Sequence, residues 1–418
     1  MLASLRYPAY RWLWLSNLSA SAGRWSLVFI LGVQILDLTH SSFWVGAGLF
    51  LTQGPVVLLA PFSGVLADRF DRRLLNSASC ALSALVTGSF ALLNALGLLA
   101  LPLLLALCLL FGVSFVLQMT LRSTLVPSLV PPRDLLNGIS LSQVGTQGAE
   151  FLGPALTTPL LVAGGPVLAW SFCALLYVCA TVLCLPIGVT KASAHSGPVG
   201  HGVGHSFQYL WARPVVMTIV VAVALHCSLT MSFQGMLPMF VSNDLHSSAA
   251  TYGGLLTSIG LGAVLGSLTL AHFSERRYRP ALFMVSLVGS GALLALMASF
   301  QALPLVFSAA FLVGASQAMF MSMSLALIQS SVDDHFRGRA TSVYQMITLA
   351  PMAVLGWGMG GVADVIEPRP VMIVMGTLFV LAMGLYLLLS PWLRRLLGAE
   401  GWRGGVTVTG PGLVGTVV

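Results

Sequence analysis

Charge is what this sequence lacks most. Of its 418 residues only 7% are Asp, Glu, Lys or Arg, whereas 57% are hydrophobic and the mean hydropathy is +0.93. A soluble domain carries about 25% charged residues, because its surface faces water. The composition therefore excludes a soluble domain, a disordered chain and a secreted disulfide scaffold, and it predicts an integral membrane protein.

Motifs for metal binding and catalysis are also missing. The six cysteines all lie inside apolar runs, and no two of them have CxxC spacing. The sequence contains no phosphate-binding loop and no nucleophile–base arrangement, which argues against an enzyme. We therefore expect no catalytic residue, no metal and no cofactor.

Long apolar runs dominate what is present. A run of about 20 apolar residues crosses a bilayer as a helix, and the continuous runs here lack the alternation of a membrane β-barrel. We expect an all-α membrane protein with twelve transmembrane helices. The predicted spans are 11–36, 43–66, 74–99, 101–125, 136–162, 166–188, 214–241, 251–272, 280–300, 303–329, 338–363 and 370–391.

The 19 basic residues are distributed unevenly over these spans. Sixteen of them fall on the same side as both termini, and Arg369 alone falls on the opposite side. Lys and Arg accumulate on the cytoplasmic side of membrane proteins. We therefore predict that both termini are cytoplasmic. This topology accounts for the net charge of +7, and no nucleic-acid partner is expected.

An internal repeat is visible at a shift of about 204 residues. Residues 67–73 then fall on residues 271–277, and Leu152-Gly153 falls on Leu355-Gly356 at a shift of 203. Two matches at nearly one offset predict a duplicated six-helix unit. The predicted parts are a six-helix bundle of residues 1–188, a cytoplasmic linker of residues 189–213, a second bundle of residues 214–395 and a disordered tail of residues 396–418.

Residues 64–73 resemble the signature between helices 2 and 3 of the major facilitator superfamily. That signature is Gly-x-x-x-Asp-Arg/Lys-x-Gly-Arg/Lys-Arg/Lys, and this chain departs from it at Asp71, where Gly is common. Residues 125–138 and 337–344 resemble the branch of enterobactin exporters and macrolide-efflux permeases. The resemblance covers about residues 5–395. It implies two six-helix bundles related by a pseudo-twofold axis, in a bacterial inner membrane.

The same resemblance implies a cytoplasmic gate. Asp68 would bind the N-terminal end of helix 11, whose free N–H groups attract an anion, and Arg122 could share this carboxylate. Alternatively, the basic residues of the loop only anchor the topology. The implied gate residues are Gly64, Asp68, Arg69, Arg72, Arg73 and Arg122.

Two opposite charges fall near the middle of predicted spans. Arg24 lies in the first span and Glu150 in the fifth. Because unpaired charges are costly at that depth, we predict that they pair or share a polar pocket. Glu150 could couple transport to a proton gradient by alternating between a carboxylate and a protonated acid, with Asp37 as a weaker candidate. Alternatively, the pair is a permanent structural strut.

Polar side chains at helical spacing predict a substrate cavity. One group of these side chains shares a helix face with Arg24 or Glu150, and a second group forms a stripe on the seventh span. The resemblance to the superfamily implies three further glutamines in the cavity. The predicted cavity residues are Asn17, Gln34, Gln118, Gln143, Gln147, His226, Gln234 and Gln317. His226 could equally be a hydrogen-bonded packing residue.

Together these features predict a secondary transporter that works by alternating access. The leading hypothesis is a proton-driven antiporter that exports a small amphipathic molecule, such as a siderophore or a drug-like compound, and acts as a monomer in the lipid bilayer. An uptake permease would share the same fold. A lipid scramblase or a membrane receptor stays open as a hypothesis from another class.

Overall fold

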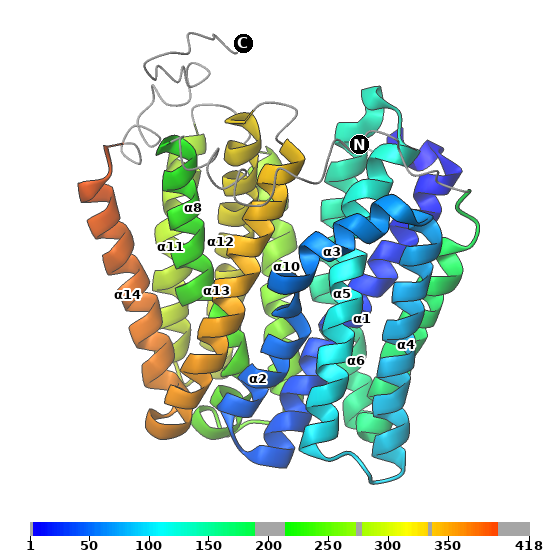
Figure 1. The fold of residues 1–418 in the computed structure, drawn as a ribbon. Coiled ribbons are helices and arrows are strands. Elements are labelled where there is room, and N and C mark those ends of the chain that lie inside the picture. Colours follow the sequence, from blue (N-terminus) through cyan, green and yellow to red (C-terminus); the bar gives the residue numbers. More distant parts are fainter. Residues whose placement is uncertain (1–2, 189–213, 273–277, 333–336, 392–418) are drawn as a thin grey trace. The chain divides into compact units, whose positions relative to one another are not determined.

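The computed structural model describes residues 3–188, 214–272, 278–332 and 337–391. Within these ranges the chain is helical almost throughout and has no strand (Figure 1). Eleven helices in this part are long and apolar enough to cross a membrane. The predicted all-α membrane fold is therefore confirmed. The predicted linker of residues 189–213 and the predicted tail of residues 396–418 lie outside the described residues.

The first half of the chain begins with a short 3₁₀-helix, η1 (Ala3–Arg6). Six helices follow: α1 (Pro8–Thr39), α2 (Ser42–Gln53), α3 (Pro55–Arg69), α4 (Arg72–Ala95), α5 (Leu101–Leu129) and α6 (Pro132–Cys184). The predicted span 43–66 is divided between α2 and α3 at Pro55, because proline lacks the N–H that a continuous helix uses.

Helix α6 contains two predicted spans in one element. Its 53 residues would measure about 80 Å as a straight helix, more than twice the ~30 Å of a hydrocarbon core. Gly165 interrupts it with φ 68° and ψ −170°, outside helical geometry. The eleven membrane-length helices of the described residues thus accommodate the twelve predicted spans, because α6 contains both the fifth and the sixth with no loop between them.

The second half begins with an irregular helical segment. It comprises α8 (Pro214–His226), the π-helix η2 (Cys227–Met231), the 3₁₀-helix η3 (Ser232–Gly235), α9 (Leu237–Met239) and the π-helix η4 (Phe240–Asp244). Regular helices follow: α10 (Ala249–His272), α11 (Arg279–Ser299), α12 (Leu303–Ser330), α13 (Arg337–Ile366) and α14 (Pro368–Leu389). Short π and 3₁₀ stretches change the direction in which successive side chains point.

The chain forms two compact units. Unit 1 comprises Met1–Gly197, Ser232–Leu261 and Ala353–Val371, and unit 2 comprises Pro198–Met231, Gly262–Met352 and Met372–Val418. Unit 1 thus combines the helices of the first half with parts of α10 and α13. We call the end of unit 1 at which α1 finishes, near Thr39, the distal end. The predicted division into bundles of residues 1–188 and 214–395 stays a prediction.

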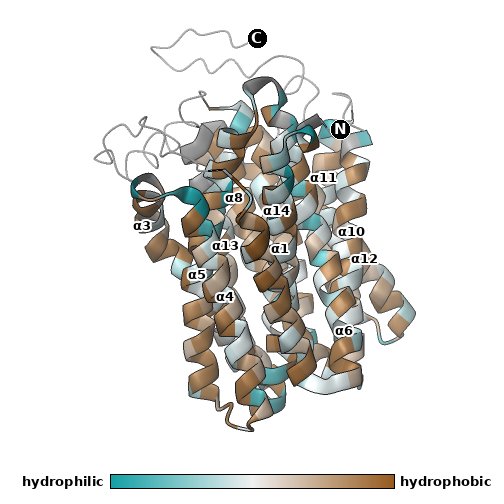
Figure 2. Cartoon of the chain, turned by 90° about the vertical axis from the view of Figure 1, so that its right-hand side faces the viewer, coloured by the Kyte–Doolittle hydropathy of each residue, from teal (hydrophilic) through white to brown (hydrophobic). Residues whose placement is uncertain are grey.

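Apolar side chains cover the outer surface of the helices. Figure 2 shows hydrophobic residues along most of the length of the labelled helices. Leu58, Leu85 and Leu388 are exposed by 73%, 69% and 72%. Large apolar side chains at this exposure suit a lipid environment rather than water. The polar residues that remain inside the units are therefore the candidates for function.

Candidate functional site

Two arginine side chains lie together in the interior of unit 1. Arg122, on α5, donates a hydrogen bond from Nη1 to Ser21 Oγ on α1 at 2.8 Å. Arg24 lies one turn further along α1 and donates from Nη2 to Gln53 Oε1 on α2 at 3.3 Å. Both guanidinium groups thus lie beside the same stretch of α1. Together with Glu150 they form what we call the charge cluster.

Glu150 is the acidic member of the charge cluster. It lies on α6 and interacts electrostatically with Arg24. Among the described residues, no basic nitrogen lies within 4.0 Å of its carboxylate. The structure therefore brings the two predicted interior charges into one region without a direct ion pair. A role of Glu150 in proton coupling stays a prediction.

The charge cluster is only partly satisfied by its neighbours. The guanidinium carbon of Arg24 lies 4.5 Å from the centre of the Phe115 ring, which provides a cation–π contact. The Nε atom of Arg122 is buried and has no hydrogen-bond partner. Such an atom costs roughly 1–3 kcal/mol. All three residues are partly rather than fully buried.

Glu150 lies where α6 packs tightly on two neighbours. A Cβ at Gly153 would lie 2.7 Å from Ala22 O of α1, and a Cβ at Gly260 of α10 would lie 2.7 Å from the carbonyl carbon of Glu150. Unit 1 includes α10 only as far as Leu261. Glu150 thus contacts the last turn of α10 that belongs to unit 1. Sequence reasoning missed Gly260, because only packing distinguishes it from the other glycines of α10.

A carboxylate joins α13 to α2 at the distal end. Asp364 accepts hydrogen bonds from the backbone N–H groups of Ser42, at 2.6 Å, and Phe43, at 3.2 Å, and from the hydroxyl of Ser41. The first N–H groups of a helix have no partner within the helix, and its N terminus carries partial positive charge. Asp364 therefore caps α2 from another helix. We call this contact the distal cap.

Next to the distal cap, α2 and α13 meet backbone to backbone. A Cβ at Gly46 would lie 2.8 Å from Trp357 Cα, and a Cβ at Gly356 would lie 3.1 Å from Ser232 O. The Trp357 ring stacks on Phe50 with centroids 5.1 Å apart. The two glycines of the predicted repeat, Gly153 and Gly356, are thus both points of close helix approach.

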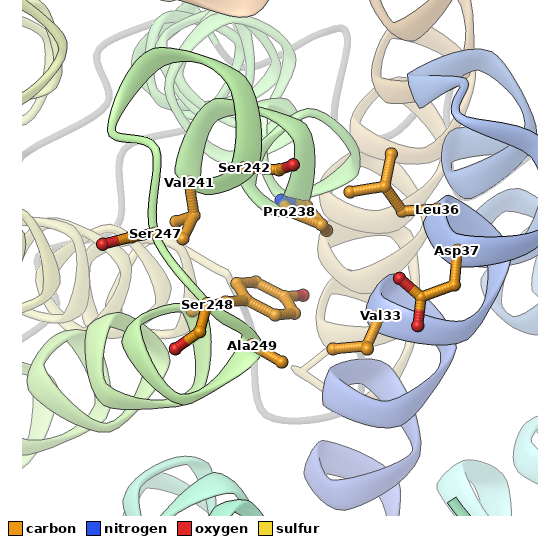
Figure 3. Close-up of a pocket in the computed structure, with 10 residues that line it drawn as sticks. Val33, Leu36, Asp37, Pro238, Val241, Ser242, Ser247, Ser248 and Ala249 are labelled. Atoms are coloured by element: carbon orange, nitrogen blue, oxygen red, sulfur yellow. The ribbon is translucent and has the colours of Figure 1, made fainter. Parts of the chain in front are cut away.

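Asp37 lines a separate cavity at the distal end. The cavity has a volume of about 220 Å³, and its lining includes Ser242, Ser247 and Tyr252. In Figure 3 the carboxylate of Asp37 lies on the α1 side of the cavity, and the serines lie on the opposite side. Asp37 follows Arg24 by 13 residues on α1, which is about 20 Å along a helix. The structure therefore does not bring Asp37 to the charge cluster.

The predicted cavity residues of the first half differ in their surroundings. Gln34 exchanges hydrogen bonds with Asn94 and accepts one from Trp170 Nε1 at 2.7 Å. Gln118 donates to Ser83 Oγ at 2.8 Å. Both amides are buried and connect helices of unit 1. Asn17 is buried, Gln147 is partly buried and Gln143 is exposed.

In unit 2 a neutral polar group surrounds His226 of α8. Its Nδ1 lies 3.1 Å from both Thr230 Oγ1 and Ser290 Oγ, and the centroids of the His226 and Phe320 rings are 4.4 Å apart. Gln317 donates to the Thr230 carbonyl at 2.5 Å. We call His226, Thr230, Ser290 and Gln317 the histidine cluster. Ser290 was missed by sequence reasoning, because it lies on α11, far away in the chain.

The predicted stripe on the seventh span does not form one group. Gln234 is buried within unit 1, whereas His226 and Thr230 belong to unit 2. The stripe assumed uniform α-helical spacing, but the π and 3₁₀ turns after residue 226 interrupt it. In the ranges that the structure describes, no group of His, Cys, Asp and Glu side chains could hold a metal ion.

The predicted gate lies mostly at the loop between α3 and α4. Asp71 caps α4 by accepting from Arg73 N at 2.9 Å, so the departure from the signature supplies a helix cap. Arg72 donates from Nε to the Ala67 carbonyl at 3.1 Å. Arg69 is exposed at the end of α3.

Three further residues complete the predicted gate. A Cβ at Gly64 would meet no atom within 4 Å, so packing alone does not require glycine there. The side chain of Asp68 lies outside the described residues, and Arg122 belongs to the charge cluster. The gate therefore stays a prediction.

Comparison with known proteins identifies relatives over nearly the whole chain. A family model described as transmembrane secretion effector matches residues 1–395. The enterobactin exporter EntS of Salmonella typhi is 27% identical over 410 residues, covering 93% of this chain and 94% of that protein. EntS of Escherichia coli O139:H28 is 26% identical over 370 residues, covering 87% of each.

Solved transporter structures share the fold. A variant of the nucleoside transporter NupG gives a TM-score of 0.71 at 13% identity, covering 91% of this chain and 99% of that chain. A bacterial homologue of the human lysosomal transporter Spinster gives 0.67 at 15% identity, covering 93% and 98%. These relatives are transporters rather than enzymes. With a family model matching all but the last residues, this chain belongs to the transmembrane secretion effector family of the major facilitator superfamily.

Proposed function

We propose that this transporter exports a small amphipathic molecule by alternating access and that the proton gradient drives it. Relatives named as enterobactin exporters support export and a siderophore-like or drug-like substrate. The position of Glu150 supports proton coupling. It is an ionisable acid in the interior of unit 1, near Arg24 but without a direct ion pair, and it keeps some accessible surface.

Protonation of Glu150 would change both its charge and its environment. As a carboxylate it is attracted to Arg24, and as a neutral acid it is released from that attraction. Its backbone rests on Gly260 of α10, so a shift of Glu150 acts on the contact between α6 and α10. Each pH unit across the membrane supplies about 1.4 kcal/mol per proton. Binding and release of this proton on opposite sides would drive the cycle.

The distribution of basic residues supports an orientation. Sixteen of 19 fall on the side of the termini, which would place both termini in the cytoplasm and the distal end outside. In that orientation, the contacts between α2 and α13 at the distal end would close the outer side. Substrate would then load from the cytoplasm and leave after these contacts separate.

The test compares Glu150→Gln with the unmodified protein in inverted vesicles. Candidate siderophores and drug-like compounds are first screened, and the compound with the largest uptake driven by a pH gradient is used. Glu150→Gln should abolish driven uptake but keep exchange without a gradient. Glu367→Gln, an exposed acid at the end of α13, serves as the matched control.

Three outcomes would contradict the proposal. Uptake that ignores the gradient in the unmodified protein would exclude proton coupling. Full driven uptake in Glu150→Gln would exclude Glu150 as the coupling acid. Transport only into right-side-out vesicles would replace export with the uptake permease.

A further inference from the structure

We infer that Asp364 controls the opening of the distal end, and that each transport cycle requires its carboxylate to release the N terminus of α2. The inference rests on the proposed alternating access. It concerns a positioning residue that the sequence did not single out. The contact is the distal cap, in which one carboxylate receives hydrogen bonds from three consecutive residues, Ser41 to Phe43.

The helix dipoles make this contact specific. Asp364 lies in the last turn of α13, which ends at Ile366, and a negative charge is unfavourable near a helix C terminus. At the N terminus of α2 the same charge is favourable. The dipole of α2 therefore stabilises the charge of the carboxylate, whereas the dipole of its own helix, α13, destabilises it. Separation of the two helices removes the stabilisation by α2, so the distal cap favours the closed state.

The N terminus of α2 depends on Asp364 in turn. Its own cap, Ser41, accepts only from Trp44 N, at a long 3.4 Å. The N–H groups of Ser42 and Phe43 donate their hydrogen bonds to the Asp364 carboxylate. A helix cap of ordinary strength changes an equilibrium about 5- to 30-fold. That is enough to bias a two-state equilibrium and weak enough to break in every cycle.

The distal cap has the reverse arrangement of the predicted gate. Asp68 lies near the C-terminal end of α3, and the resemblance predicts that it binds the N terminus of helix 11. Asp364 lies near the C-terminal end of α13, which is helix 11, and caps the N terminus of α2. If the predicted gate forms, each span would have an acid whose partner is the start of the other span. Such contacts, at opposite ends of two rigid spans, would alternate as the transporter switches.

The test measures how often the distal end is closed. A Cβ at Gly361 would lie 4.0 Å from Phe43 Cβ, within the range of a disulfide. The pair Phe43→Cys and Gly361→Cys, with the exposed Cys179 changed to Ser, should cross-link under mild oxidation. The rate at limiting oxidant reports the closed population. Transport should stop on oxidation and return on reduction.

Two substitutions remove the distal cap from opposite sides. Asp364→Asn removes the charge. Ser42→Pro removes one donor N–H at the first helical position, where proline is tolerated. Each should slow cross-linking about fivefold or more, as expected for loss of a cap. Asp364→Glu should restore most of the rate, and Glu367→Gln should leave it unchanged.

The outcomes separate this inference from the proposed function. Equal cross-linking rates in Asp364→Asn, Ser42→Pro and the unmodified background would overturn the role of Asp364, even if the disulfide blocks transport. If the cap variants cross-link more slowly but the oxidised double-cysteine protein still transports, the role of Asp364 stands and alternating access is refuted. Slower cross-linking together with a reversible block supports both.

Discussion

The charge cluster of unit 1 and the histidine cluster of unit 2 are both polar groups inside the helical interior, but they differ in charge. The histidine cluster contains no carboxylate or guanidinium group. Its hydroxyl, amide and imidazole groups contact one another beside aromatic rings, while His226 Nε2 is buried without a hydrogen-bond partner. The charge cluster has two cations and one acid, no direct ion pair and an unpartnered Nε. Each cluster thus contains one buried nitrogen without a hydrogen-bond partner, which costs roughly 1–3 kcal/mol, so the two clusters differ in the presence of formal charges rather than in polar satisfaction. Because the charge cluster contains the proposed coupling acid, Glu150, the proposed function predicts that transport depends on it more than on the histidine cluster.

The largest expected effect concerns the charge cluster. Arg24→Gln should lower driven transport about 100-fold, equivalent to ~2.7 kcal/mol, because Glu150 would lose its counter-charge. His226→Gln should lower it by less than threefold, about 0.6 kcal/mol. Initial rates in vesicles, normalised to folded protein, measure both. Arg11→Gln, an exposed arginine on the same helix, is the control. Equal losses in Arg24→Gln and His226→Gln would remove the distinction between the clusters.

The second prediction concerns the packing beside the charge cluster. Gly153→Ala should destabilise the protein by about 1–3 kcal/mol, because the new methyl group would contact the α1 backbone. Gly148→Ala, on the same helix with no atom within 4 Å of the new Cβ, should be neutral or slightly stabilising. Thermal unfolding followed by tryptophan fluorescence measures both. A loss at Gly148 as large as that at Gly153 would contradict the packing argument.

A smaller effect on stability should separate the clusters again. Ser290→Ala should cost about 1 kcal/mol, because it removes a contact of the buried His226. Arg122→Gln should cost less, because it also removes the unpartnered Nε atom. The unfolding midpoints of both variants give the answer. The comparison fails if Arg122→Gln is the less stable of the two.

The smallest effect is expected at Asp37. This residue is exposed and about 20 Å along α1 from the charge cluster. Asp37→Asn should therefore change driven transport by less than twofold, about 0.4 kcal/mol. A loss comparable with that of Glu150→Gln would instead extend the working site to the distal cavity.

The sequence predicted well what depends on transfer between water and lipid. The spans follow from apolar run length, and the matched depth of Arg24 and Glu150 follows from their distances to span ends. Contacts between distant helices were harder to anticipate. In the sequence Asp364 looked like any acid near a span end. The backbone N–H groups that donate hydrogen bonds to it lie more than 300 residues away in the chain. Gln34 and Gln118 looked like cavity residues, since their partners come from other helices.

The glycine at position 165 has a consequence for how the fifth and sixth spans are joined. With φ at 68° it adopts a conformation that other residues reach at a cost of about 1 kcal/mol or more. The segments on either side have no hydrophilic connection between them. The two spans therefore form a hairpin without a loop, and we expect a bulky residue at this position to destabilise the hairpin.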